Sequence, residues 1–177
     1  MNRTALLIID MQAEMQRRLD AGRDCVNPCA GDVLAELVAT CRERGVPVLH
    51  VRHRTESGAF HPTSPGFPAM ACAEAAPGEA VFVKTTSSAF ASTDLEAHLR
   101  AEGISRLVIT GAVAGFCVNS TTRAAKDLGF DCLVVRDAVI GFDLPSMPAR
   151  PLFDATMALL DGDFARVMDA AEVIEAL

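Results

Sequence analysis

The sequence predicts an α/β fold in which helices cover a mostly parallel β-sheet, and three observations carry this prediction. Short apolar runs alternate with amphipathic segments at helical spacing, as in chains built from strand–helix–strand units. The first run, residues 5–9, is continuously apolar, which is typical of a strand buried on both faces. The chain of 177 residues fits one domain and shows no internal repeat, so residues 1–177 are assigned to a single domain.

Helix boundaries are predicted from capping residues and glycines. Asn27 and Pro28 have the residue types of an N-cap and a first helical residue, and Gly45 is a typical C-terminal stop. Thr93 and Glu96 have capping-box spacing, which predicts a second helix. Further helices are predicted over residues 117–128, 152–160 and 170–177. The predicted strands span residues 5–9, 46–51, 81–83, 107–110, 132–135 and 164–167, the last at a sheet edge.

Residues 55–79 form a long irregular segment that contains four of the nine prolines and three glycines. Loops of this length in compact domains often cover functional sites. A surface excursion or a subunit contact fits the composition equally well, so both interpretations stay open.

Composition excludes several classes of partner. The net charge of −7 leaves no basic surface for nucleic acid, and no apolar stretch approaches the ~20 residues of a membrane span. The N-terminal apolar run is interrupted by Asp10 and lacks the features of a signal peptide, so we expect a cytoplasmic protein. The six cysteines need form no disulfides in a chain with this much core. We expect a homodimer or homotetramer, which composition does not test.

Three chemically complementary side chains follow predicted strands. Asp10 comes directly after the first strand, Lys84 after the third, and Cys117 after the turn that follows the fourth. Ligands of open α/β sheets bind outside the carboxyl ends of the strands, so we expect these side chains to share one edge of the sheet. The 16 basic residues include only two lysines, which draws attention to Lys84 behind an apolar run.

Each of these residues also has an ordinary structural interpretation. Asp10 could cap the following loop, Lys84 could be a solvated strand end, and a lone cysteine such as Cys117 is more often a core residue. At the start of a helix and beside an ammonium, however, a thiol would favour its nucleophilic thiolate form, and backbone N–H groups there could bind an oxyanion. An acid, an ammonium and a thiol together suit nucleophilic catalysis.

The segments ALLIIDMQ, VFVKTTSSAF and LVITGAVAGFCVNSTTRAAKDLGF, followed by LVVRDA, resemble the isochorismatase-like cysteine hydrolases over nearly the whole chain. The resemblance implies a Rossmann-like, three-layer α/β/α fold with a six-stranded sheet. It also implies that Cys117 is the nucleophile, Asp10 the general base and Lys84 the partner of the thiolate. A cis peptide bond between Ala112 and Val113 would leave the Val113 and Cys117 amides as an oxyanion hole. The implied reaction is hydrolysis of a non-peptide C–N bond in a small amide-like substrate.

Departures from the family pattern concern the pocket. Met15 stands where many members have an aromatic residue, and Ala114 and Gly115 replace more polar residues, so these positions are interpreted as pocket wall. The nicotinamidase branch has an Asp/His metal cluster after the second strand, which this chain lacks, so we expect no metal and no cofactor. His53 and Arg54 are candidates to face the substrate. The predicted substrate-binding residues are Gln12, Met15, His53, Phe90 and Phe116.

Two alternatives to an amidase stay open. Vinyl-ether hydrolysis of the isochorismatase kind is one, although those relatives generally lack the nucleophilic cysteine. A non-catalytic or redox-sensing protein that uses the same reactive thiol is the other.

Overall fold

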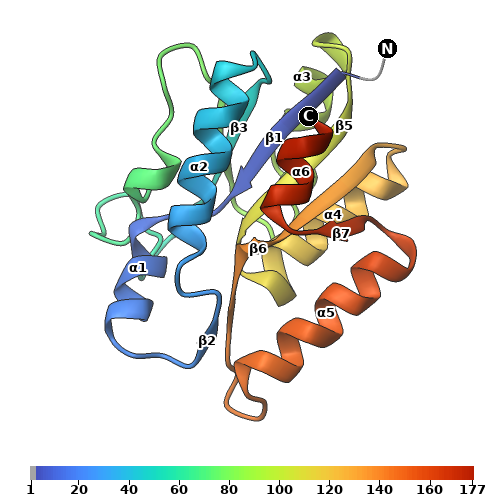
Figure 1. Cartoon of the computed structure of the whole chain (residues 1–177). Coiled ribbons are helices and arrows are strands. Elements are labelled where there is room, and N and C mark those ends of the chain that lie inside the picture. The colour runs from blue at the N-terminus through green and yellow to red at the C-terminus, as the bar shows by residue number, and fades with distance from the viewer. Residues whose placement is uncertain (1–2) are drawn as a thin grey trace.

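A sheet of seven strands lies between two layers of helices in the computed structural model, which describes residues 3–177 (Figure 1). The strands run in the order β2-β6-β5-β1-β3-β4, and β7 pairs with β6. Six of them pair in parallel, as the alternating sequence pattern predicts. The strands are β1 (Arg3–Ile9), β2 (Cys25–Val26), β3 (Val48–His53), β4 (Val81–Lys84), β5 (Ile104–Ala112), β6 (Asp131–Phe142) and β7 (Arg166–Met168).

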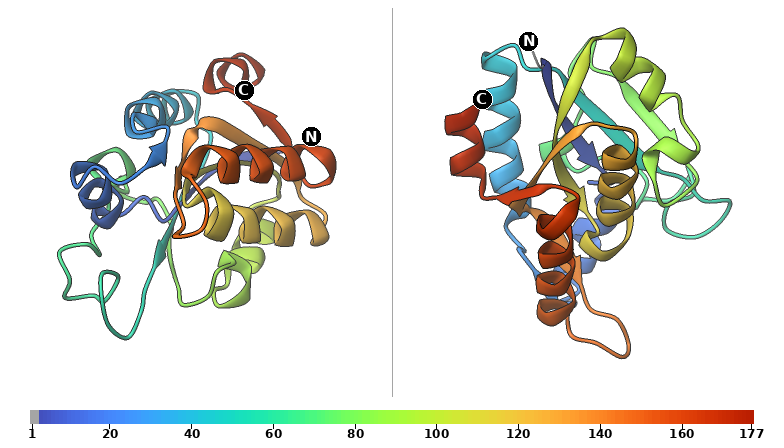
Figure 2. Two further views of the ribbon diagram at one scale, coloured as in Figure 1. Left: turned by 90° about the horizontal axis from the view of Figure 1, so that it is seen from below. Right: turned by 90° about the vertical axis from the view of Figure 1, so that its right-hand side faces the viewer.

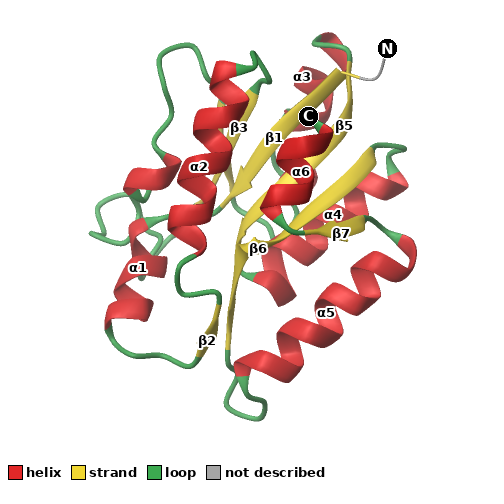
Figure 3. Ribbon diagram, in the orientation of Figure 1, coloured by secondary structure: helices red, strands yellow, loops and turns green. Residues whose placement is uncertain are grey.

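The helices divide between the two faces of the sheet (Figures 2 and 3). Helices α1 (Ala13–Asp20), α2 (Ala30–Glu43) and α6 (Ala170–Ala176) pack on one face. Helices α3 (Leu95–Ala101), α4 (Asn119–Asp127) and α5 (Ala149–Asp163) pack on the other. Short helical turns span Ala71–Ala73, Ala89–Ala91 and Ala114–Val118, the last of them a π-helical turn.

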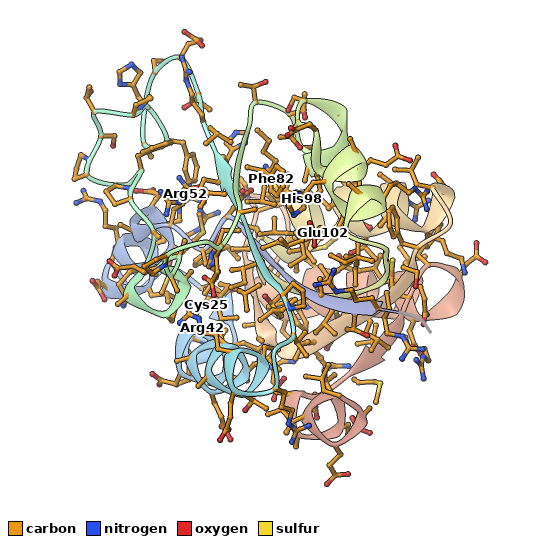
Figure 4. The ribbon with its side chains drawn as sticks, turned by 90° about the horizontal axis from the view of Figure 1, so that it is seen from above. Cys25, Arg42, Arg52, Phe82, His98 and Glu102 are labelled. Carbon is orange, nitrogen blue, oxygen red and sulfur yellow. The ribbon has the colours of Figure 1, made fainter. Side chains whose placement is uncertain are left out.

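The first strand shows why a continuously apolar run predicts burial on both faces. In β1 the side chains of Leu7 and Ile9 belong to the core beneath α3, α4 and α5, whereas Leu6 and Ile8 belong to the core beneath α2. All four are essentially inaccessible to solvent. At the far edge, Phe82 of β4 packs edge-on against His98 of α3 with ring centroids 5.4 Å apart (Figure 4).

The predicted fold class is confirmed, with one correction to the sheet. A seventh strand, β2, is present because β6 continues to Phe142 instead of ending near residue 135. This extension pairs Gly141 and Phe142 with Val26 and Cys25 in antiparallel register. A two-residue strand leaves no periodic pattern in a sequence. The expected count of six strands is therefore one too low, because it omits β2.

Both predicted helix N-caps are also wrong. Asn27 has a positive φ of 58°, and its side chain donates hydrogen bonds to the carbonyls of Arg136 and Val139, so α2 begins later, at Ala30. Thr93 accepts a hydrogen bond from the Leu95 amide, but it lies before the N-cap of α3 and forms no capping box. In both cases the polar side chain serves a turn instead of the helix end.

No helix within residues 3–177 is long and apolar enough to cross a membrane.

Helix α1 was not predicted. The sequence of α1, AEMQRRLD, buries only Met15, which leaves too few apolar residues to show helical spacing.

Gly111 is expected to be essential for the junction of β5 with its neighbours. It has a φ of +119°, and a Cβ atom there would collide with the carbonyl oxygen of Ile9 on β1. We expect Gly111→Ala to lower the free energy of unfolding by at least about 3 kcal/mol, measured by urea denaturation. Gly103→Ala is the matched control, because Gly103 also has a positive φ but open space around it. Gly103→Ala should lower the free energy of unfolding by only ~1–2 kcal/mol. An equal loss in the two variants would contradict the steric role of Gly111.

Candidate functional site

The carboxyl ends of four neighbouring strands bring the predicted residues together. Asp10 follows β1, His53 ends β3 and Lys84 ends β4, directly opposite His53 in the strand register. Cys117 lies in the turn that follows β5. Asp10 has a φ of +51°, a left-handed conformation that aspartate tolerates better than most residues. Residues far apart in the chain therefore meet because parallel strands end at one edge.

Lys84 is the centre of this cluster and is completely buried. Its Nζ lies 2.7 Å from Oδ2 of Asp10 and 3.2 Å from Sγ of Cys117. The same atom is 3.1 Å from Nδ1 of His53 and donates to the Thr86 carbonyl at 3.1 Å. The ammonium thus joins the carboxylate and the thiol, and these contacts offset the cost of burying its charge.

The surroundings of Cys117 favour the protonated form of its thiol. Burial, and then the negative charge of Asp10, raise the pKa of Cys117 to about 11, against the opposing effect of Lys84. This rise in pKa runs against the expectation that the resting thiol favours its thiolate form. Cys117 also does not open a helix, because it lies within the π-helical turn Ala114–Val118 that precedes α4. The peptide bond before this turn, Ala112–Val113, is cis, as the resemblance implied.

Asp10 has the properties of a proton acceptor for this thiol. Burial raises the pKa of Asp10 above its usual value, while the charge of Lys84 opposes the rise. Oδ2 is paired with Lys84, whereas Oδ1 is buried and has no hydrogen-bond partner among residues 3–177. A carboxylate with one free oxygen and a raised pKa is suited to take a proton from a neighbouring group and return it.

His53 is a neutral neighbour of the cluster. Burial, followed by the positive charge of Lys84, lowers its pKa, so the ring is uncharged at neutral pH. Its Nδ1 lies 3.1 Å from Nζ of Lys84, where an unprotonated ring nitrogen can accept a hydrogen bond from the ammonium. His53 therefore helps to fix the ammonium without adding charge.

A cavity of about 290 Å³ opens beside Cys117. Three of the five predicted substrate-binding residues line it, namely Met15, His53 and Phe116. The full lining consists of Asp10, Met15, Arg18, His53, Phe60, Thr85, Thr86, Ser87, Ala112, Val113, Phe116 and Cys117. A larger hollow of about 660 Å³ lies between α1, α2 and residues 69–72, but it holds none of the clustered ionisable groups.

The other two predicted substrate-binding residues do not line the cavity. Gln12 is completely buried, and its amide joins the backbone of His53 to the carbonyl of Phe67. It is a structural tie between β3 and the irregular segment. Phe90 stacks on Phe130 with ring centroids 5.9 Å apart, so it packs against the core as a partly buried residue.

Further pocket assignments need correction as well. Ala114 is buried in the core, and Gly115 faces Leu152 and Thr156 of α5, so neither forms pocket wall. Arg54 is exposed and lies 3.8 Å from Glu56, outside the cavity lining.

Five lining residues were missed by sequence reasoning: Arg18, Phe60, Thr85, Thr86 and Ser87. Arg18 belongs to the helix that was not predicted. Phe60 lies in the irregular segment 55–79, which supplies part of the wall, as one of the two open interpretations suggested. An aromatic residue within a Pro/Gly-rich loop was the available signal for Phe60.

His50 of β3 and His61 of the irregular segment lie outside the cavity lining and have other partners. His50 lies 2.8 Å from the carboxylate of Glu79, and His61 lies 2.9 Å from the Thr63 hydroxyl. Residues 3–177 contain no group of three or more His, Cys, Asp or Glu side chains arranged to hold a metal ion.

The high pKa of Cys117 gives a direct prediction for its ionisation. With a pKa of about 11, only about one thousandth of the Cys117 thiol should be ionised at pH 8. The ultraviolet absorbance of the thiolate is followed against pH as the difference between wild type and Cys117→Ala. The Asp10→Asn variant should titrate at lower pH, since it loses a negative charge that raises this pKa. A wild-type midpoint below pH 8 would contradict the assignment.

Comparisons with known proteins identify the family of this chain. The Isochorismatase domain model matches residues 4–172. The isochorismatase-family protein YddQ of Bacillus subtilis is 34% identical over 173 residues, covering 93% of this chain and 94% of that protein. A crystal structure of a hydrolase of the isochorismatase family from Chromobacterium violaceum superimposes with a TM-score of 0.90 at 33% identity, covering 99% of this chain and 93% of that one.

Relatives with named activities are also found. Streptothricin hydrolase of Streptomyces noursei is 34% identical over 148 residues, which cover 81% of this chain and 52% of that enzyme. N-carbamoylsarcosine amidase of Arthrobacter is 34% identical over 102 residues, which cover 58% of this chain and 36% of that enzyme. The domain match across nearly the whole chain, together with the shared fold, shows that this chain belongs to the isochorismatase family of hydrolases.

Proposed function

We propose that the protein is a cysteine hydrolase that cleaves a non-peptide C–N bond of a small amide through a thioester on Cys117. The observation that carries the proposal is the buried cluster in which Lys84 contacts both the Asp10 carboxylate and the Cys117 thiol. The amidase and hydrolase activities of named relatives support the reaction class.

The first half of the reaction forms the thioester. Sγ of Cys117 attacks the carbonyl carbon of the amide while its proton passes to Asp10, because a thiol with a pKa of about 11 needs a base. The carbonyl oxygen becomes an oxyanion, which the backbone amides of Val113 and Cys117 stabilise. The C–N bond then breaks, and Asp10 returns the proton to the departing amine or ammonia.

The second half releases the acid. Asp10, again a carboxylate, takes a proton from water as the water attacks the thioester carbonyl. The C–S bond breaks, the sulfur regains a proton, and a carboxylic acid leaves. Lys84 stays protonated throughout, so that Asp10 is ionised at the start of each half and the developing negative charge on sulfur is stabilised.

A screen of small primary and N-substituted amides for ammonia or amine release tests the proposal. The wild type should hydrolyse at least one of them and show a mass increase on the Cys117 peptide after acid quenching. Cys117→Ala should lose both the turnover and the adduct. Cys132→Ala is the control, because Cys132 is buried in the core away from the cavity. Turnover that survives in Cys117→Ala would overturn the mechanism.

A further inference from the structure

Arg18 of α1 is a charged residue in the cavity that the proposed mechanism does not use. Its side chain is 26% exposed and lines the same 290 Å³ cavity as Cys117. Nothing in the chemistry of thioester formation requires a guanidinium there. We propose that Arg18 binds a carboxylate of the substrate, so that the substrate is a small amide that also carries an acid group.

The guanidinium is held in a fixed orientation. Its central carbon lies 5.7 Å from the ring centroid of Phe60 and 5.8 Å from that of Phe142. Its Nε donates to Oε1 of Glu14 at 3.0 Å. Within residues 3–177 Glu14 engages only this nitrogen of Arg18, which leaves the two terminal nitrogens for a ligand. A planar, pre-oriented guanidinium with free terminal N–H groups matches the geometry of a carboxylate.

The charges around the cavity favour an anionic ligand. Asp10 and Lys84 form a pair whose charges cancel, and His53 and Cys117 are neutral at neutral pH. Arg18 therefore contributes the remaining charge of the lining. Glu14 offsets it only in part, because Arg17 also approaches this carboxylate, at 3.6 Å.

The size and walls of the cavity limit the rest of the substrate. A volume of about 290 Å³ holds roughly ten non-hydrogen atoms, taking ~30 Å³ for each water-sized group. Met15, Phe60 and Phe116 supply an apolar wall between the polar groups. A short carbon chain with an amide at one end and a carboxylate at the other fits this cavity. The amide part of this substrate class rests on the proposed function.

Alkylation of Cys117 tests the anion site without any knowledge of the substrate. Iodoacetate and iodoacetamide differ in charge and attack the same sulfur, so the ratio of their rates cancels the effect of the thiol pKa. We expect Arg18→Met to lower this ratio at Cys117 by roughly tenfold or more, because a charge-assisted contact to the anionic reagent is lost. The modified Cys117 peptide is quantified by mass spectrometry, since five other thiols are present.

Arg17→Met is the matched control. It removes the same charge from the same helix and from the same Glu14, but Arg17 lies outside the cavity lining and its side chain is 61% exposed. Its ratio should change far less than that of Arg18→Met, because Arg17 acts on the cavity only indirectly, through Glu14. An unchanged ratio in Arg18→Met, or an equal fall in both variants, would overturn the proposal.

A measurement on the wild type keeps the proposal testable if Arg18→Met does not fold. Propionate should protect Cys117 from iodoacetamide at concentrations where propionamide does not. Equal protection by the two compounds would contradict a carboxylate site at Arg18. The substrate class is then tested with the monoamide of succinic acid against its methyl ester. The acid should be preferred in kcat/KM, mainly through KM, and the preference should vanish in Arg18→Met.

These outcomes separate the two proposals. If the alkylation ratio depends on Arg18 but no amide is hydrolysed, the anion site stands and the amidase assignment fails. If neutral amides are hydrolysed through Cys117 and the alkylation ratio does not depend on Arg18, the amidase assignment stands and the anion site fails.

Discussion

Asp10→Asn should lower kcat by about 10²–10⁴-fold while the protein stays folded. Asparagine has nearly the same shape as aspartate but accepts no proton, and the protonated Cys117 thiol then has no base beside it. The measurement is steady-state turnover of an amide identified in the screen, with circular dichroism and thermal unfolding as checks of the fold. Asp127→Asn is the control, because Asp127 is an exposed residue of α4 outside the cavity.

The pH dependence of turnover gives the same assignment a second readout. In the proposed mechanism the carboxylate of Asp10 is the active form, and burial raises its pKa above the usual value of 3.8. Activity of the wild type should therefore fall as the pH drops through a value above the usual range of aspartate. The residual activity of Asp10→Asn should lack this acidic limb. Wild-type turnover in Asp10→Asn, or an unchanged limb, would remove Asp10 from the mechanism.

Lys84→Met should impair both stability and turnover. Methionine fills much of the space of the lysine side chain but leaves the buried Asp10 carboxylate without its counter-charge. Breaking a buried ion pair in this way typically costs about 3–5 kcal/mol of unfolding free energy. Urea denaturation at pH 7 measures this loss, and amide turnover should fall with it because the negative charge on sulfur is no longer stabilised.

Two variants separate charge from packing in this prediction. Lys126→Met changes the other lysine, which is exposed on α4, and should leave stability within about 0.5 kcal/mol of the wild type. Asp10→Asn combined with Lys84→Met removes both charges and should recover part of the loss. The cost of Lys84→Met should also shrink at acidic pH. In the Lys84→Met variant at low pH, the Asp10 carboxyl binds a proton in the folded state, because loss of Lys84 raises its pKa further. The variant therefore loses stability only as the pH rises through that pKa. A pH-independent loss would point to packing instead of charge.

The parallel sheet was predictable because its strands carry a local signal. Residues 5–9 are apolar without interruption, and the structure buries Leu6 and Leu7 against opposite helical layers. The extra strand β2 and the helix α1 were not predictable in the same way. The first is two residues long, and the second buries only Met15, so neither has enough apolar residues to form a pattern.

The candidate site was also predictable only in part. Asp10, Lys84 and Cys117 were predicted to meet because each follows a parallel strand, and their contacts of 2.7 and 3.2 Å agree with that prediction. Gln12 and Phe90 were assigned to the pocket from their place in the chain alone. In the structure Gln12 is a structural tie and Phe90 packs against the core. Sequence order identifies the edge of a sheet where a side chain begins, but it does not determine the direction in which that side chain points.

The sequence by itself determined the fold class, the family and the strand ends that hold the acid, the ammonium and the thiol. These follow from local patterns, namely apolar runs, glycines and short motifs. Only the tertiary structure decided that burial and Asp10 raise the pKa of the Cys117 thiol, and that Arg18 and Phe60 share its cavity. The physical reason is that a pKa depends on burial and on charges brought close by the fold, and a cavity wall depends on which segments pack together.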